Sequence, residues 1–320
     1  MWKTIVRRLI ILVPQLIALS LTIFLLAEML PGDALGGLVG ADIGWDEWQH
    51  MRAELGLDRP WTIRYVDWVA GMFQGDFGRS VIQARPVTQI VAERLGNTVR
   101  LSIVTLIFLY GIAIPFGVLA GRFKDTAIDK VIVFYTFFAI AMPTMIFAIF
   151  VLYIFGFILG WFPVLGSVDV TVARGTLAFH LSRLEHLIMP ALTGAILGTA
   201  GIVNILRERL IDTENSDYVM TARSKGVPRR LLWNRHIFKN SALPIVAGFG
   251  WALVGVAGGS IFIETAFSFP GMGSLFVHAI ITRDFPVANA LIMFYGVLTV
   301  MGSLLADLFM MMLDPRIRIK

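Results

Sequence analysis

The sequence predicts an all-α integral membrane protein with six transmembrane helices, and three observations lead to this prediction. The composition is 57% hydrophobic with only 15% charged residues, and the mean hydropathy is +0.77. A soluble core formed by 320 residues cannot bury so much apolar surface. Six apolar runs are each long enough to cross about 30 Å of hydrocarbon. Every lysine lies at a chain end or in the second or fourth connection between these runs.

The predicted spans are Leu9 to Leu30, Leu101 to Ala120, Val131 to Trp161, Leu187 to Leu206, Leu243 to Ile263 and Val287 to Leu313. The first run follows Lys3, Arg7 and Arg8, as the core of a signal peptide would. Its apolar length of about 22 residues is too great for a signal core. No cleavage site of small residues follows it either. The run is therefore interpreted as a retained first span.

Proline residues predict where the spans are irregular. The third run is longer than one span needs and contains Pro143, which predicts a kink or a tilt at that point. Pro14 and Pro115 are similarly placed in the first and second runs.

The distribution of basic residues predicts that both termini are cytoplasmic. Eight lysines and arginines lie between Arg207 and Lys239, in the connection after the fourth run. Arg122, Lys124 and Lys130 lie in the connection after the second run. Short connections rich in Lys and Arg stay on the cytoplasmic side of a membrane. An even number of spans then places the two ends of the chain on that same side.

The long polar segment after the first span is predicted to be extracytoplasmic. It runs from Pro31 to Thr98 and contains four tryptophans, Trp45, Trp48, Trp61 and Trp68. Tryptophan favours the membrane interface, so short amphipathic helices are expected there; an ordinary folded loop is the alternative. The predicted domains are 1–30, the first span; 31–98, the extracytoplasmic segment; 99–313, a five-helix core with a cytoplasmic loop at 207–241; and 314–320, a cytoplasmic tail.

Several kinds of chemistry have no visible site in the sequence. The absence of cysteine excludes disulfides and Cys-ligated metals. The net charge of +5 is explained by basic cytoplasmic loops, so no nucleic acid partner is expected. No phosphate-binding loop or nucleophile motif is present, and the five histidines do not have metal-ligand spacing. We therefore predict no catalytic residue, no metal site and no cofactor bound by this chain.

The fourth connection carries clear helix-boundary signals. Ser216 is a good N-cap and Asp217 follows it in the first turn. Arg223 and Lys225 lie in the last turn, and Gly226 suits the left-handed position after a helix. These signals predict one helix from Ser216 to Lys225 and a second from Pro228 to about Asn240, on the inner membrane surface.

One face of the first of these helices has the shape of a docking element. Tyr218, Ala222 and Lys225 share a face by their spacing, with Thr221 beside them. Small residues next to an aromatic side chain fit a groove on a partner. The alternative is a solvated connecting helix whose charges only orient the protein.

This stretch resembles a known family. Thr221-Ala222, then Gly226, then Leu243-Pro244 resemble the "EAA" loop of bacterial ATP-binding-cassette importer permeases, which couples membrane subunits to ATPases. Met220 and Thr221 stand where the family has Glu and its first Ala. The distance of 18 residues from Gly226 to Pro244, together with "NRHIFKNSALP", is similar to the oligopeptide, dipeptide and nickel permease subfamily.

Further stretches extend the resemblance over nearly the whole chain, in the order expected. They are "LPGDAL", "LGLDRPWTIRYVDWVAGMFQGDFGRS", "IETAFSFPGMGSLFVHAIITRDFPVANALI" and "LLADLFMMMLDPRIRIK". Within the subfamily the chain resembles the first membrane subunit of oligopeptide importers.

The resemblance implies a type I importer fold in the bacterial cytoplasmic membrane and a path for oligopeptides or dipeptides. It implies a second, homologous permease, two cytoplasmic ATPases that bind ATP and Mg, and an extracytoplasmic peptide-binding protein. Nickel or another small solute is an alternative cargo, and a secondary transporter driven by an ion gradient is an alternative class. The residues that the resemblance assigns to ATPase coupling are Ser216, Asp217, Tyr218, Thr221, Ala222, Arg223, Lys225 and Gly226.

A few small or polar residues in the predicted spans are candidates for a gate or for the transport pathway. Asn204 lies in the fourth span, and Gly255, Gly258 and Gly259 lie in the fifth. Glycines allow helices to approach closely, either to slide or to pack statically. Glu264 ends the fifth span, where the resemblance makes a structural or gating contact at least as good an expectation as substrate binding.

Overall fold

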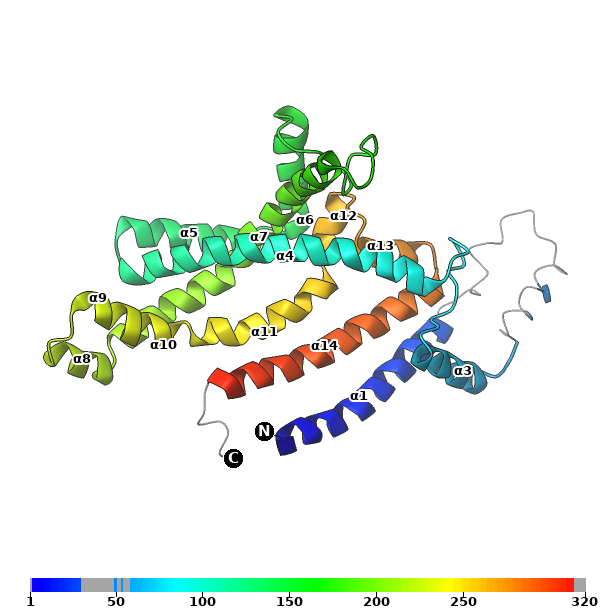
Figure 1. The fold of residues 1–320 in the computed structure, drawn as a ribbon, viewed down its shortest axis with the longest axis horizontal. Helices are drawn as coiled ribbons and strands as arrows, with labels where there is room; N and C mark the ends of the chain where they lie inside the picture. The colour runs from blue at the N-terminus through cyan, green and yellow to red at the C-terminus, as the bar shows by residue number, and fades with distance from the viewer. Residues whose placement is uncertain (1, 30–48, 51–52, 54–57, 314–320) are drawn as a thin grey trace.

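The described part of the chain is helical, which confirms the all-α prediction. The computed structural model describes residues 2–29, 49–50, 53 and 58–313. Helices α1, α4, α7, α11 and α14 lie roughly side by side, with α8 and α9 at one end and α3 at the other (Figure 1). The elements are α1 (Trp2–Met29), α3 (Trp61–Phe73), α4 (Val87–Arg122), α5 (Ala127–Ala141), α6 (Thr144–Val151), η1 (Leu152–Ile158), α7 (Leu177–Glu214), α8 (Asp217–Ser224), α9 (Arg229–Leu231), η2 (Leu232–Phe238), α10 (Lys239–Ser241), α11 (Leu243–Gly258), α12 (Ile261–Ala266), α13 (Met272–Ile281) and α14 (Phe285–Leu313).

Three of the described helices are long and apolar enough to cross a membrane, judged by length and composition. They are α4, α7 and α14, the last over Phe285–Leu305. A fourth span results if α5 and the helix after Pro143 count as one broken span. The apolar stretch Ile10–Leu26 of α1 and the 16-residue α11 are shorter. The six spans and the orientation of the two termini therefore stay predictions.

The third predicted span is broken at its proline. The segments Ala127–Ala141 and Thr144–Ile158 meet at an angle of 105°. Met142 and Pro143 have extended backbones, with ψ of 119° and 128°. Proline lacks the N–H that a helix needs and disfavours helical geometry in the residue before it, so the helix stops and restarts. The predicted kink is confirmed, whereas α1 and α4 continue through their prolines.

The fifth predicted span is not one helix, and the prediction of an uninterrupted run from Leu243 to Ile263 is wrong. Helix α11 ends at Gly258, and α12 begins at Ile261. Between them Gly259 has φ 68° and ψ −172°, a backbone conformation that L side chains rarely adopt. The glycine therefore turns the chain, and an apolar run of sufficient length is interrupted.

The most extensive helix pairing joins α4 to α7. A Cβ added at Gly117 would lie 2.9 Å from Leu206, and one added at Gly121 would lie 2.8 Å from Leu210. Both leucines are fully buried in α7. Because small residues allow two backbones to approach, these glycines fix how closely the helices pack. Helix α4 also begins at Val87, well before the predicted span.

Helix α1 packs on α14, the last helix of the chain (Figure 1). Leu19 lies directly over Gly296, where a Cβ would overlap the leucine side chain. At the C-terminal end of α1, Glu28 forms an ion pair with Arg64 of α3. The contact of Leu19 with Gly296 thus brings α1 and α14, which are far apart in the sequence, side by side.

One of the helices expected in the polar outer segment is present. Helix α3 contains Trp61 and Trp68 and has no buried residue. Trp68 lies 5.9 Å from the ring of Phe24 in α1, measured between ring centroids. This confirms a short helix in that segment, while its depth in a membrane interface stays a prediction. Trp45 and Trp48 lie outside the described residues.

Candidate functional site

The predicted docking helix exists, as α8, with the expected ends. Ser216 occupies the N-cap position with an extended backbone, φ −75° and ψ 148°, but its Oγ donates to the Thr213 carbonyl at 2.6 Å instead of capping α8. Asp217 is in the first turn and Arg223 in the last. Gly226 has φ 73°. The Val227 N–H reaches back to the Ala222 carbonyl at 3.2 Å, which is the bond of a glycine-ended helix.

The buried and exposed residues of α8 are not grouped as the spacing predicted. Val219 is 0% exposed and Ala222 9%, and both belong to an apolar cluster with α7 and η2. Tyr218 is 46% exposed and Met220 53%. The expectation that Ala222 shares a partner-facing side with Tyr218 is therefore corrected, because Ala222 packs within its own chain. The exposed face of α8 consists of Asp217, Tyr218, Met220, Thr221, Arg223 and Ser224.

The remaining residues assigned to coupling lie around this face. Thr221 Oγ1 donates to the Asp217 carbonyl at 2.9 Å, within the helix. Asn240 Nδ2 donates to Tyr218 Oη at 3.2 Å, and this bond joins α8 to α10. Lys225 is exposed at the C-cap position. The structure thus brings the predicted residues together on one short helix, and their coupling role stays a prediction.

Arg223 has an acidic neighbour in its own chain. Its Nη2 lies 3.6 Å from Glu214 Oε1, near the end of α7. The two side chains are 60% and 41% exposed, so the pair contributes little, about 0–1 kcal/mol. Arg223 therefore remains accessible to a second anionic group.

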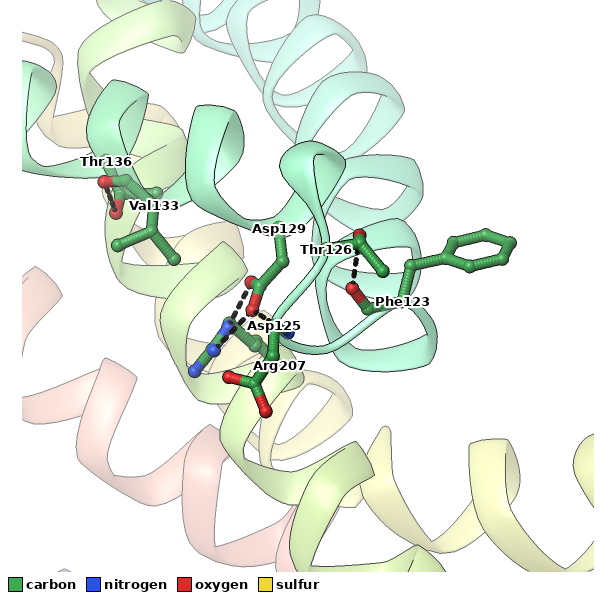
Figure 2. A network of polar contacts seen from close by, with 7 residues as sticks. All are labelled: Phe123, Asp125, Thr126, Asp129, Val133, Thr136 and Arg207. Atoms are coloured by element: carbon green, nitrogen blue, oxygen red, sulfur yellow. Dashed lines mark hydrogen bonds and ion pairs between the residues drawn. The ribbon is translucent and has the colours of Figure 1, made fainter.

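A buried ion pair holds α7 just before α8, and sequence reasoning missed it. Arg207 donates from Nε and Nη2 to the two oxygens of Asp129, at 2.6 and 2.7 Å (Figure 2). The Asp129 side chain is only 3% exposed. The Asp125 N–H donates to the same carboxylate at 2.9 Å. This forked pair fastens the turn between α4 and α5 onto α7. The only signal in the sequence was the presence of two acids, Asp125 and Asp129, within a basic connection.

A basic cleft lies beside α8. Its volume is about 880 Å³, and its lining includes four arginines but one acid. Arg122, the last residue of α4, lies 5.4 Å from the ring centroid of Trp233 in η2. The complete lining is Arg122, Glu214, Arg223, Val227, Arg229, Arg230, Leu232, Trp233, Asn234 and Ile237.

Glu264 lies in a different place, at the start of α12, and is fully buried. Its carboxylate accepts from Thr98 Oγ1 at 2.8 Å and from the N–H groups of Gly273 and Ser274 at 2.6 and 3.0 Å. Thr98 Oγ1 accepts in turn from the Met272 N–H at 2.7 Å. One carboxylate thus joins α4, α12 and the first turn of α13. This geometry makes Glu264 a structural tie in the conformation described.

The other pathway candidates are placed differently from one another. A Cβ at Gly259 would clash with Glu264. A Cβ at Gly255 or Gly258 would meet no described atom within 4 Å, so the close helix approach expected of these two glycines is not found in the described chain. Asn204 is partly buried in α7. A pathway role for any of them stays a prediction.

A second buried carboxylate that sequence reasoning missed, Asp284, accepts hydrogen bonds from the segment before α4. Ser80 donates its hydroxyl to the buried Asp284, between α13 and α14. The Val81 N–H donates to the same carboxylate at 3.2 Å. Among the described residues, no three His, Asp or Glu side chains gather as metal ligands do.

Comparison with known proteins identifies the family of this chain. The model of the family described as binding-protein-dependent transport system inner membrane component matches residues 113–319, and that of its N-terminal part matches residues 1–102. An oligopeptide transport system permease protein of Bacillus subtilis (strain 168) is 33% identical over 314 residues, 98% of each chain. A putative peptide transport system permease protein of Brucella abortus (strain 2308) is 31% identical over 318 residues, 99% of each chain. A probable peptide ABC transporter permease protein of Sinorhizobium fredii (strain NBRC 101917 / NGR234) is 31% identical over 314 residues, 98% of each chain. The chain therefore belongs to the family of inner membrane components of binding-protein-dependent transport systems.

Proposed function

We propose that this chain is a permease subunit of an ATP-driven importer of peptides in a bacterial cytoplasmic membrane. The observation that carries the proposal is α8, a short helix that exposes one face and packs the other against the end of the long helix α7. Relatives that match the chain over almost its whole length carry the names of oligopeptide and peptide permeases. Such a helix suits a subunit that receives movement from a partner.

The rest of the transporter is supplied by other chains in this proposal. A second, homologous permease completes the path, and an extracytoplasmic peptide-binding protein delivers the cargo. Two ATPases hold ATP and Mg, since this chain lacks a phosphate-binding loop. One ATPase binds the exposed face of α8. The chain has six spans, and both termini lie on the side of α8, which is the cytoplasm.

The contacts of α8 supply a route for coupling. Val219 and Ala222 lie in one cluster with Leu206 and Leu210 of α7. These leucines fill the space opposite Gly117 and Gly121 of α4. A displacement of α8 would therefore be passed to α7 and from there to α4, because tightly packed side chains transmit displacement. The ATPases bias the transporter only if they bind its two states with different affinity.

Two alternatives differ from this proposal in cargo and in energy source. Nickel or another small solute would use the same class of transporter. A secondary transporter would use an ion gradient and buried acids at the membrane midplane. The buried Glu264 is occupied by three hydrogen bonds to its own chain, which favours a structural role over ion coupling.

Uptake by reconstituted vesicles tests the proposal. The chain is co-expressed with a homologous permease, two ATPases and a binding protein of a peptide importer, and uptake of a labelled oligopeptide is measured with ATP inside the vesicles. We expect uptake with ATP and none with a nonhydrolysable analogue. Uptake that needs no ATP and is abolished by an ionophore would establish the secondary transporter. Uptake of nickel without peptide would correct the cargo.

A further inference from the structure

The basic cleft beside α8 has more positive charge than its own chain neutralises. Of its four arginines, Arg223 alone has a carboxylate within 4.0 Å among the described residues, and that pair is the exposed one with Glu214. Arg229 and Arg230 are exposed on the helix that forms one wall. Four guanidinium groups around a volume of about 880 Å³ favour an anionic occupant.

The geometry at the wall of the cleft suits a phosphate group. The Arg122 guanidinium lies 5.4 Å from the Trp233 ring and 5.6 Å from the Phe123 ring, which orients it. A guanidinium binds phosphate oxygens through two hydrogen bonds at once, and an oriented one loses less freedom in doing so. Trp233 belongs to a seven-residue π-helix, a form often found at functional sites.

Exposed apolar side chains beside the cleft distinguish a lipid from a free anion. Phe123 follows the cleft residue Arg122 directly and is 38% exposed. Leu231, between the cleft residues Arg230 and Leu232, is 47% exposed. A small phosphate ion would leave these side chains in water, whereas acyl chains would cover them.

We propose that this cleft binds the phosphate headgroup of an anionic lipid, in the membrane leaflet on the side of α8. The proposal deepens the proposed function and rests on it for the position of α8 at the membrane surface. Basic groups at that surface attract anionic lipids, and tryptophan favours the same depth. Because Arg223 belongs to α8, the lipid contacts the coupling helix itself.

Lipid retention by the purified transporter, without ATP or peptide, tests the proposal. Native mass spectrometry counts molecules of phosphatidylglycerol and of phosphatidylcholine that remain bound to the wild type and to two double variants. Arg229→Gln with Arg230→Gln removes two charges from the cleft. Arg235→Gln with Lys239→Gln removes two exposed charges from the following elements η2 and α10, outside the cleft lining, and is the matched control.

We expect phosphatidylglycerol retention to fall roughly tenfold or more in the cleft variant, since each basic residue contributes several-fold to anionic lipid binding. The control variant should retain the lipid as the wild type does, and phosphatidylcholine should be retained by none. A cleft variant that does not fold is replaced by Arg229→Lys with Arg230→Lys, which keeps the charge but loses the fork and should lose part of the retention.

Three results would overturn the proposal. Equal losses in the two glutamine variants would mean that surface charge attracts lipid without a site. Displacement of phosphatidylglycerol by millimolar inorganic phosphate would mean a simple anion site. Unchanged lipid retention with loss of ATPase co-purification would mean that the cleft binds protein. Failed peptide uptake with lipid still retained would count against the proposed function alone.

Discussion

Asp129 and Arg207 join the start of α5 to α7 through two hydrogen bonds of 2.6 and 2.7 Å, seven residues before the last residue of α7 (Figure 2). The aspartate is 3% exposed, so removal of the arginine would leave a buried charge without its counterion. A displacement of α7 at this point would therefore act on both α5 and α8.

The first prediction concerns this ion pair. Arg207→Met should destabilise the protein by about 3–5 kcal/mol, because breaking a buried pair leaves one charge uncompensated. Asp129→Leu combined with Arg207→Met should recover much of that loss. Thermal unfolding of the three proteins in detergent measures both effects. A single variant as stable as the wild type would mean that the pair contributes nothing.

The second prediction concerns the contacts of Glu264. Thr98→Val removes both the hydrogen bond to Glu264 and the acceptor for the Met272 N–H, and should cost about 1–3 kcal/mol. Thr98→Ser keeps the hydroxyl and is the control. Thermal unfolding again gives the comparison, and equal stability of the two variants would refute the role assigned to the hydroxyl.

The third prediction concerns the contact between α4 and α7. Gly117→Ala places a Cβ 2.9 Å from Leu206 and should destabilise by about 1–3 kcal/mol, the usual cost of overpacking. Gly111→Ala lies on the same helix with no atom within 4 Å of its Cβ, so it should be neutral or stabilising by up to about 1 kcal/mol. Denaturation of both variants, measured side by side, should show a loss of stability in Gly117→Ala alone. Equal stability of the two variants would contradict the contact.

The fourth prediction separates the two faces of α8. Met220→Lys, on the exposed face, should leave thermal stability unchanged and reduce ATP-driven uptake. Ala222→Lys, which forces a charge into the cluster with Leu206, should lower stability as well. Uptake and unfolding are measured on both proteins. If Met220→Lys transports normally, the partner does not bind this face.

The fifth prediction concerns orientation and uses the absence of cysteine. Val170→Cys lies before α7 at a position that is 95% exposed, and it should react with an impermeant thiol reagent added outside intact cells. Ser224→Cys, on α8, should react only after the membrane is permeabilised. The reverse pattern would place α8 on the outer side.

Features decided by neighbouring residues could be predicted from the sequence. Gly226 and the residues around it define the end of α8, and Pro143 defines the break after α5, since both act through local backbone geometry. Glu264 could not be interpreted fully, because its partners Thr98 and Gly273 come from other helices. The spacing of α8 predicts which residues are neighbours on the helix, but periodicity does not tell which of them the chain itself covers, and Ala222 was therefore wrongly placed on the exposed face with Tyr218.

The contact between Leu19 and Gly296 has a consequence for biogenesis. Helix α1 leaves the ribosome long before α14, on which it packs, so its packing surface stays uncovered while the chain between the two helices is synthesised. During that interval its helix-packing surface faces lipid or an insertion factor. A ribosome that stalls before Gly296 releases a chain in which α1 lacks its packing partner, and such a product is a target for membrane quality control.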